Sequence, residues 1–242
     1  MTRYAVYALP GALAIDPIRP SSAASSGTLG QLPDAPEAVR LREVVEAWYA
    51  REEFRDLTVD ARRYGFHATL KAPFRLADGR SEAELREAAG AFAAARGSVT
   101  IAAPRPAALD RFRALLPTGD QSELDALAAD AVREFDGFRA APNADEIGRR
   151  RPERLAPRER ELLERWGYPY VLDRFRFHMT LTDPVPADRA AEVDAALESH
   201  FAAVSGVDVP LRSIALFVEP EPGDPFEILS VHPFAPAGEH RP

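Results

Sequence analysis

Short apolar runs alternate with amphipathic stretches along this chain, and turn residues separate most of them. Residues 3–9 predict a first strand that ends at a Pro-Gly turn, and further strands are expected at residues 99–103, 111–116, 211–218 and 226–231. Apolar positions at helical spacing predict helices over residues 37–52, 81–95, 122–136, 156–166 and 187–204. No glycine-rich phosphate loop follows any of these strands. This order favours an antiparallel α+β fold over a doubly wound parallel sheet.

One short pattern occurs twice. Residues 64–70 and 175–181 align without a gap and share an aromatic residue, then Phe, His, Thr and Leu at matched places. The offset between the two histidines, His67 and His178, is close to half of the chain. A repeat of this period is typical of a duplicated structural unit.

The repeat predicts a single domain, residues 1–242, built from two lobes. The first motif half spans about residues 1–110 and the second about residues 111–242, and exchange of strands between the lobes is left open. Residues 16–36 are rich in Pro, Ser, Ala and Gly and show no period, so we expect a flexible loop there.

Each motif has the alternation of a strand, in which successive side chains point to opposite faces. One face is apolar and belongs in a core. The other face carries His67 and Thr69 in the first copy and His178 and Thr180 in the second. Lys71, the chain's one lysine among 30 basic residues, falls on the face of His67. Lys71 either contacts a phosphate or has no special role and is simply the one lysine in a chain whose composition favours arginine.

Two imidazoles and two hydroxyls at one site suit acid–base chemistry at phosphorus. A neutral histidine takes a proton from water, while a protonated one gives a proton to the departing oxygen. The hydroxyls of Thr69 and Thr180 can hold the non-bridging oxygens. We expect no metal and no other cofactor, because a zinc hydrolase would need about three protein ligands around an open position.

The duplicated His-x-Thr-Leu pattern resembles the 2H phosphoesterase superfamily. The longer strings, residues 64–74 and 166–182, are similar to a branch named for phosphonate metabolism. The resemblance implies a two-lobed, pseudo-symmetric fold, with antiparallel sheets flanking a central cleft and helices outside. It also implies hydrolysis of a cyclic phosphodiester such as a ribose cyclic phosphate. Asp183 stands where that branch has glycine, and its carboxylate would either repel a phosphate or bond to a turn.

Three further residues are candidates for substrate binding. Tyr168 and Tyr170 come just before the second motif, where a phenol at the cleft rim would bind phosphate or sugar; packing in the core is the alternative. Arg176 lies on the polar face of the second motif and would add positive potential, although exposed strand arginines are also common. Residues 149–165 mix arginine with glutamate and predict a solvated helix.

Composition narrows the partners. The chain carries 30 basic and 38 acidic side chains, a formal net charge of −8, which repels long nucleic acids and leaves a small phosphorylated substrate held in a local basic pocket.

The absence of cysteine excludes disulfides, thiol nucleophiles and thiolate metal sites. No apolar run is long enough to span a membrane, and Pro10-Gly11 interrupts the one segment that resembles a secretory signal. We therefore expect a cytoplasmic protein.

The sequence thus predicts a metal-independent phosphodiesterase that hydrolyses a small cyclic phosphate ester of a sugar or nucleotide, with His67 and His178 as catalytic residues. Two alternatives stay open. One is an RNA 2′,3′-cyclic phosphodiesterase or end-joining enzyme, and the other is a non-catalytic module that binds a phosphate ester and regulates a partner. The near-symmetry of the motifs leaves the acid and the base unassigned.

Overall fold

The computed structural model describes residues 1–12 and 34–236, so most of the loop predicted at residues 16–36 lies outside the described residues. The strands are β1 (Arg3–Ala8), β2 (Ala68–Phe74), β3 (Val99–Ile101), β4 (Arg105–Leu109), β5 (Phe112–Leu116), β6 (Met179–Thr180), β7 (Val209–Leu211), β8 (Ser213–Glu219) and β9 (Glu227–Pro233). The α-helices are α1 (Pro36–Tyr49), α2 (Val59–Tyr64), α3 (Glu82–Ala94), α4 (Ser122–Glu134), α5 (Ala144–Arg149), α6 (Pro157–Trp166) and α7 (Ala190–Phe201). Short 3₁₀-helices are η2 (Glu52–Leu57), η3 (Phe135–Phe138), η4 (Pro152–Arg154) and η5 (Leu172–Arg174).

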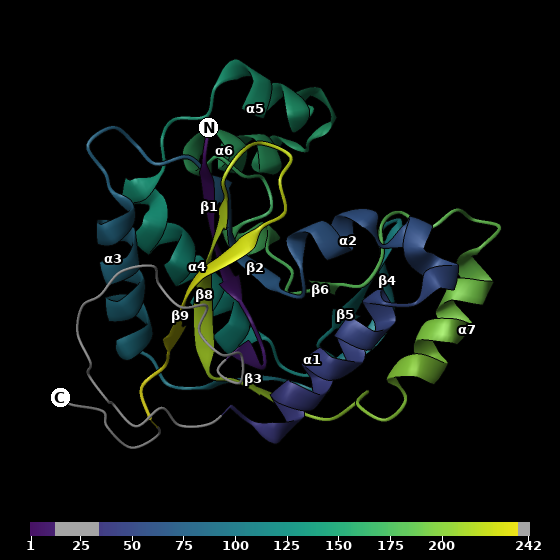
Figure 1. Cartoon of the computed structure of the whole chain (residues 1–242). Coiled ribbons are helices and arrows are strands. Elements are labelled where there is room, and N and C mark those ends of the chain that lie inside the picture. The colour runs from purple at the N-terminus through teal and green to yellow at the C-terminus, as the bar shows by residue number, and fades with distance from the viewer. Residues whose placement is uncertain (13–33, 237–242) are drawn as a thin grey trace.

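All strand pairs are antiparallel, which confirms the predicted α+β class (Figure 1). A four-stranded sheet has the order β2-β1-β8-β9, and a three-stranded sheet has the order β4-β5-β6. A separate pair joins β3 to β7. The strands that hold the two motifs, β2 and β6, are therefore edge strands of two different sheets, and they lie next to each other.

Strands from both ends of the chain build the larger sheet. The central strand β1 pairs with β2 on one side and with β8 on the other. Because β8 and β9 come from the last part of the described chain, the sheet that holds the first motif is completed by strands that follow the second motif.

One hydrophobic core runs under both sheets. It joins Val6 of β1, Leu70 of β2, Met179 of β6 and Trp48 of α1, all of which are buried. Helices α3 and α4 pack against the four-stranded sheet and α7 packs against β4. A smaller apolar cluster that includes Tyr7 covers the opposite face of the four-stranded sheet. The shared core fixes the two sheets relative to each other.

Several predicted helix ends are confirmed in atomic detail. Helix α3 begins with a capping box at the predicted start: the Ser81 hydroxyl accepts from the N–H of Glu84 at 3.2 Å, and the Glu84 carboxylate accepts from the N–H of Ser81 at 2.8 Å. Gly167 ends helix α6 with φ near 73°, a left-handed conformation that glycine adopts without a steric cost.

Both motif strands begin later in the chain than the sequence predicts. Tyr64 is the last residue of helix α2, and β2 begins only at Ala68, because Gly65 with φ near 71° turns the chain between them. Strand β6 has two residues, Met179 and Thr180. Strand β4 and helices α2 and α5 are not predicted at all; they are short, and their sequences lack a clear period.

Candidate active site

The first motif histidine is held by its own backbone and by a neighbouring ring. The Nδ1 atom of His67 lies 2.9 Å from the carbonyl oxygen of Gly65. The imidazole also stacks on Tyr7 of β1, with ring centroids 3.8 Å apart and an angle of 19° between the planes. A ring fixed at one nitrogen and across one face has a defined orientation.

The second histidine has the same local arrangement. Its Nδ1 atom lies 2.8 Å from the carbonyl oxygen of Arg176, again two residues earlier in the chain, and Phe112 of β5 lies 5.7 Å from the His178 ring. A carbonyl oxygen can only accept, so Nδ1 carries the proton in both neutral rings. In both rings Nε2 is therefore the nitrogen with a free lone pair.

Five of the predicted site residues line one cleft of about 500 Å³. They are Thr69, Tyr168, Tyr170, Arg176 and His178. His67 and Thr180 do not line this cleft, although each is two residues in sequence from a residue that does. The fold thus brings together parts of two motifs that stand almost half of the chain apart in the sequence.

Burial follows the predicted alternation. The intervening residues are almost fully covered: Phe66, Ala68 and Leu70 in the first copy, and Phe177, Met179 and Leu181 in the second. The histidines and threonines between them are only partly buried. Each strand therefore gives its apolar side to the shared core and its polar side to the cleft.

The two motif threonines have unused hydroxyls. Among residues 1–12 and 34–236, neither the Thr69 nor the Thr180 side chain has a hydrogen-bond partner. The Thr180 carbonyl, in contrast, accepts from the Tyr49 hydroxyl at 2.6 Å. Both hydroxyls are thus free to bind a ligand beside the imidazoles.

The two imidazoles interact electrostatically. Burial lowers the pKa of His67 to about 4; the hydrogen bond to Gly65 opposes this shift, and repulsion from a positive charge on His178 adds to it. Burial also lowers the pKa of His178, against the hydrogen bond to Arg176. Both rings are consequently neutral at neutral pH in the free protein, and protonation of one disfavours protonation of the other.

Acid should destabilise the fold through its buried histidines. Burial lowers the pKa of both His67 and His232 from 6.5 to about 4, so the unfolded chain binds protons in this range and the folded chain does not. The contribution of these rings to the free energy of unfolding should be complete above pH 6.5 and fall as the pH drops from 6.5 toward 4. Urea unfolding across this range measures it. The stability of His67→Gln should fall less steeply, and a slope equal to that of the wild type would contradict the assignment.

The predicted face of Lys71 is wrong. Thr69 pairs with Tyr7, but Lys71 pairs with Val6, the very next residue of β1, so Leu70 is an extra residue in a β-bulge. The bulge turns the lysine to the opposite face, where it is only 3% exposed. Its ammonium donates to the carbonyl of Val132 at 2.9 Å and to Asp136 at 3.2 Å. Lys71 ties β2 to helix α4 and takes no part in the cleft.

The remaining candidates differ in their surroundings. Tyr168 is partly buried, carries the Arg150 guanidinium 4.6 Å from its ring centre, and contacts the Tyr170 ring edge-on at 5.7 Å. Tyr170 is 48% exposed. Arg176 is exposed on the cleft and has no ion pair within the described part of the chain.

Of the two roles considered for Asp183, the structure shows the bond to a turn. Its carboxylate accepts from the backbone N–H groups of Asp60 and Ala61 at 3.1 Å each, and these groups open helix α2. A carboxylate at this position satisfies N–H groups that have no partner within the helix. The residue that follows the second motif thus anchors the helix that leads into the first motif.

Removing this carboxylate should loosen the connection between the two motifs. Asp183→Ala leaves the first turn of α2 without its acceptor, so we expect a loss of about 1–2 kcal/mol in the free energy of unfolding. Asp183→Asn retains an oxygen acceptor and should lose less. Urea titrations of both variants measure the difference, and an alanine variant as stable as the wild type would contradict this role.

Sequence reasoning missed the residues that position the motif strands. Tyr7 supports the ring of His67, and the Trp48 indole of α1 donates to the carbonyl of Leu181 at 2.9 Å. Tyr49 supports β6 in the same way. The sequence offers one signal for these residues, the aromatic pair Trp48 and Tyr49 at the end of an amphipathic helix. Packing in the core explains that pair equally well.

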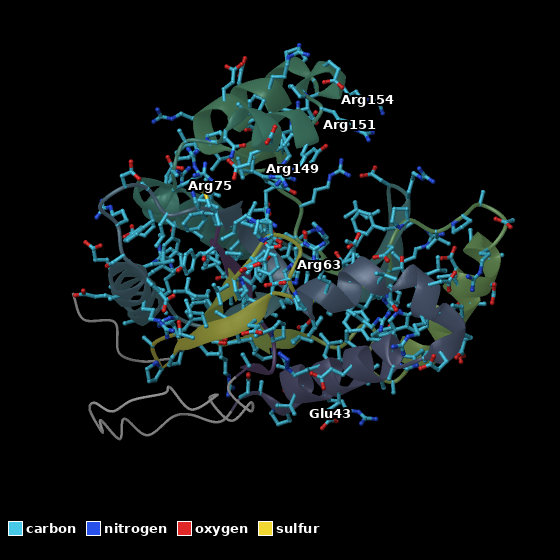
Figure 2. The ribbon with its side chains drawn as sticks, turned by 45° about the horizontal axis from the view of Figure 1, so that its top comes forward. Glu43, Arg63, Arg75, Arg149, Arg151 and Arg154 are labelled. Carbon is cyan, nitrogen blue, oxygen red and sulfur yellow. The ribbon has the colours of Figure 1, made fainter. Side chains whose placement is uncertain are left out.

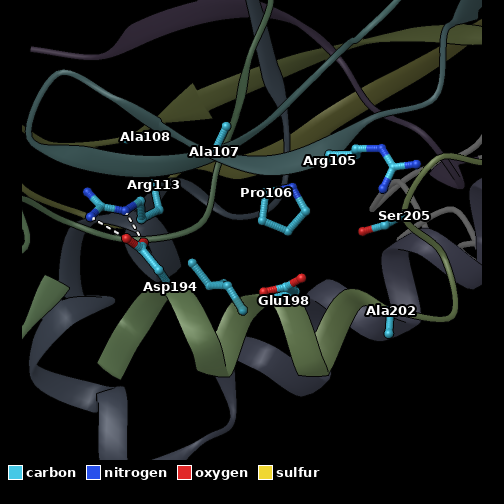
Figure 3. A pocket seen from close by; sticks show the side chains of 10 residues that line it. Arg105, Pro106, Ala107, Ala108, Arg113, Asp194, Glu198, Ala202 and Ser205 are labelled. Carbon is cyan, nitrogen blue, oxygen red and sulfur yellow. Dashed lines mark hydrogen bonds and ion pairs between the residues drawn. The ribbon is translucent and has the colours of Figure 1, made fainter. Parts of the chain in front are cut away.

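A larger hollow of about 580 Å³ lies elsewhere, between β4 and α7 (Figure 3). Its main polar pair is already satisfied, because the Arg113 guanidinium donates to both carboxylate oxygens of Asp194. It contains no residue of either motif. The chemistry-bearing side chains therefore favour the smaller cleft as the candidate site.

Within residues 1–12 and 34–236, no group of three or more His, Asp or Glu side chains is arranged to hold a metal ion. In the same ranges, no helix has the length and apolar character needed to cross a bilayer.

The fold and the cleft define an α+β protein in which edge strands of two antiparallel sheets lie side by side, and Thr69 of the first motif lines the same cleft as His178 of the second. Sequence comparison places it in a family. The chain matches, over residues 69–227, the family described as a protein of unknown function, DUF1045, and it belongs to that family.

Two curated relatives carry the same name. A protein of Janthinobacterium sp. (strain Marseille), named ribose 1,5-bisphosphate phosphokinase PhnN, is 41% identical over 99% of this chain and 52% of its own length. The protein of that name in Laribacter hongkongensis (strain HLHK9) is 37% identical over 80% of this chain and 48% of its own length. The chain therefore spans about half the length of the curated relatives it matches.

The solved structures to which this chain is similar share less sequence identity with it than the curated relatives do. A crystal structure described as a phosphoesterase aligns with 97% of this chain and 99% of its own, at a TM-score of 0.41 and 14% identity. The crystal structure of E. coli LigT complexed with NADP⁺ aligns with 97% and 98%, at a TM-score of 0.42 and 15% identity. Scores and identities this low support no conclusion about the site.

Proposed function

We propose that this protein is a metal-independent phosphodiesterase that opens a small cyclic phosphate ester by two-histidine acid–base catalysis. The observation that carries the proposal is the matched pair of imidazoles. His67 and His178 directly precede the neighbouring edge strands β2 and β6, and each is fixed through Nδ1 by the carbonyl two residues earlier, which leaves Nε2 free for proton transfer. A site that only bound phosphate would have no need for two rings held in the same tautomer.

The proposed reaction is a single displacement at phosphorus. Nε2 of one histidine takes a proton from water while the water oxygen forms a bond to phosphorus. The bond from phosphorus to one ring oxygen of the ester breaks, and the second histidine gives its Nε2 proton to that oxygen. The product is a phosphate monoester, and exchange of one proton with solvent restores both rings.

The structure favours His67 as the base and His178 as the acid. Burial and the neighbouring His178 hold the pKa of His67 at about 4, so its ring stays neutral and able to accept. An anionic ester in the cleft raises the pKa of a nearby imidazole, and His178 lines this cleft beside the guanidinium groups of Arg174 and Arg176. These two arginines would attract the ester, and the hydroxyls of Thr69 and Thr180 would bind the non-bridging oxygens.

Although the two curated relatives are named as kinases, we do not propose kinase activity for this chain. A phosphate-binding P-loop needs glycine directly before its lysine. The one lysine here, Lys71, follows Leu70 and is buried against Val132 and Asp136. What the relatives' name does support is a role in ribose phosphate metabolism, which agrees with a sugar cyclic phosphate as the substrate.

A screen of cyclic phosphate esters in the presence of a chelator tests the proposal. The panel should contain ribose 1,2-cyclic phosphate, the four nucleoside 2′,3′-cyclic phosphates and an oligonucleotide with a 2′,3′-cyclic end, with ³¹P NMR to follow ring opening. We expect turnover of at least one small ester that a chelator leaves unchanged.

Other outcomes favour the alternatives. Turnover of the oligonucleotide alone, falling steeply with salt, would indicate an RNA-end enzyme. Tight binding of these esters with no ring opening would indicate a non-catalytic module. Activity that a chelator abolishes would overturn the metal-independent mechanism.

A further inference from the structure

A second pocket beside the cleft is lined by arginine. Its volume is about 300 Å³, and one carboxylate, Glu146, lines it together with six guanidinium groups: Arg3, Arg63, Arg75, Arg139, Arg149 and Arg150. The arginines of this pocket come from separate elements: Arg149 lies on helix α5, Arg63 lies on α2, and Arg75 directly follows β2 (Figure 2). Such a concentration is unexpected in a chain with a net charge of −8.

Four of these arginines have carboxylate partners. Glu219, which is fully buried, pairs with both Arg3 and Arg63. Arg75 donates to both oxygens of Glu146, at 3.0 and 3.1 Å, and Arg139 donates to Asp136 at 2.9 Å. Arg63 also lies 3.7 Å from Asp60, so four carboxylates face these four arginines, and the positive balance of the pocket comes from Arg149 and Arg150.

Arg149 and Arg150 have no ion pair to any residue in the described ranges 1–12 and 34–236. Arg149 is exposed, and Arg150 lies over the ring of Tyr168 at 4.6 Å. Tyr168 also lines the cleft that contains His178. Arg150 therefore lies where the arginine pocket meets the cleft, whereas Arg149 lines the pocket near Glu146 and helps to lower the pKa of that carboxyl.

Three tyrosines, Tyr7, Tyr64 and Tyr168, lie near this boundary between the arginine pocket and the cleft. Tyr64 lines the arginine pocket, and its ring centroid is 6.3 Å from that of His67 and 5.2 Å from the Arg63 guanidinium. Burial raises the pKa of Tyr7, and the nearby phenols of Tyr64 and Tyr168 raise it further. Among the described residues, none of these three hydroxyls has a hydrogen-bond partner. Unused donors beside unpaired guanidinium groups are the chemistry that binds phosphate.

We propose that the arginine pocket binds a phosphate monoester on the same substrate whose cyclic phosphate lies between His67 and His178. The inference rests on the proposed function and narrows its substrate class to esters that carry two phosphate groups at opposite ends of a sugar. Arg149 and Arg150 hold the monoester, and Tyr64 and Tyr168 contact the sugar that connects the two groups.

Binding of a simple monoester tests the pocket without any catalysis. The probe is ribose 5-phosphate, titrated calorimetrically into the wild type, into R149Q/R150Q and into R151Q/R154Q. The last variant loses the same charge from exposed positions of the same segment, outside the pocket (Figure 2). We expect the wild type and R151Q/R154Q to bind equally and R149Q/R150Q to bind at least about tenfold more weakly.

Kinetics on matched esters then tests whether the pocket serves the reaction. Each of two cyclic esters, one built on ribose and one on adenosine, is compared with its 5-phosphorylated form. Wild-type kcat/KM should be at least about tenfold higher for the phosphorylated member of a pair, mainly through KM, and R149Q/R150Q should lose this preference. The control variant R151Q/R154Q should keep both this preference and the wild-type kcat on the unphosphorylated esters.

The outcomes separate the two proposals. Equal binding of ribose 5-phosphate by all three proteins, or turnover with no preference within either pair, would overturn the arginine pocket as a phosphate site while leaving the hydrolase standing. Binding that depends on Arg149 and Arg150, without turnover of any cyclic ester, would support the pocket and overturn the hydrolase.

Discussion

Replacing either motif histidine with alanine should lower turnover of a cyclic phosphate ester by about 10²-fold or more. Each ring performs one proton transfer in the proposed step, and the other ring already performs the opposite transfer. His67→Ala also removes the partner of Tyr7, so its stability must be measured separately from its activity. Steady-state kinetics under saturating ester gives the change in kcat, and circular dichroism confirms the fold.

His200 offers a matched control. This histidine lies on α7, where its Nε2 atom contacts the carbonyl oxygen of Val44 at 2.9 Å, and it does not line the cleft. His200→Ala should keep the kcat of the wild type, whatever it loses in stability. Full activity in folded His67→Ala or His178→Ala would remove that ring from the mechanism.

Loss of a motif hydroxyl should give the next largest effect. Thr69→Val and Thr180→Val keep the shape of the side chain and delete one donor each, and the loss of a donor to developing negative charge costs about 10²-fold in kcat. Because neither hydroxyl bonds to another described residue, the stability of both variants should change little. Measured kcat values set beside melting temperatures separate the two effects.

Serine at these positions distinguishes a chemical role from a packing role. Thr69→Ser and Thr180→Ser retain the hydroxyl and lose a methyl group, so most of the activity should return. If valine and serine variants lose activity equally, the methyl group and its packing matter, and the hydroxyl does not bind the ester.

The sequence predicts the fold class and the alternation within each motif better than it predicts how the strands are arranged. Alternation of apolar and polar residues in two copies placed His67, Thr69, His178 and Thr180 on polar faces, and the burial of the residues between them agrees. That inference needs only local geometry, which a strand of any length provides. The placement of β2 beside β6, as edge strands of two different sheets, depends on long-range contacts, and the repeat only suggested it.

Lys71 shows where local reasoning fails. Strict alternation put its ammonium beside His67, but one extra residue in β2 relative to β1 turns Lys71 to the opposite face. A bulge depends on the partner strand, so nothing in residues 68–74 alone indicates it. The same limit applies to Tyr7, whose importance comes from the His67 ring, which a distant part of the sequence supplies.

Asp183 illustrates a different limit. A carboxylate next to a proposed phosphate site suggested repulsion as readily as a structural bond. The choice was settled by helix α2, which the sequence did not predict, because its six residues are too few to show a period.

The arrangement of the larger sheet has a consequence for biosynthesis. Its central strand β1 is synthesised before the other strands of that sheet, yet its partner β8 follows only after both motifs have been made. Until then β1 has one open side, and the nascent chain cannot close the sheet that supports His67. We therefore expect this protein to acquire its active form only after β8 has left the ribosome, and an isolated first half to remain aggregation-prone rather than to fold as a working lobe.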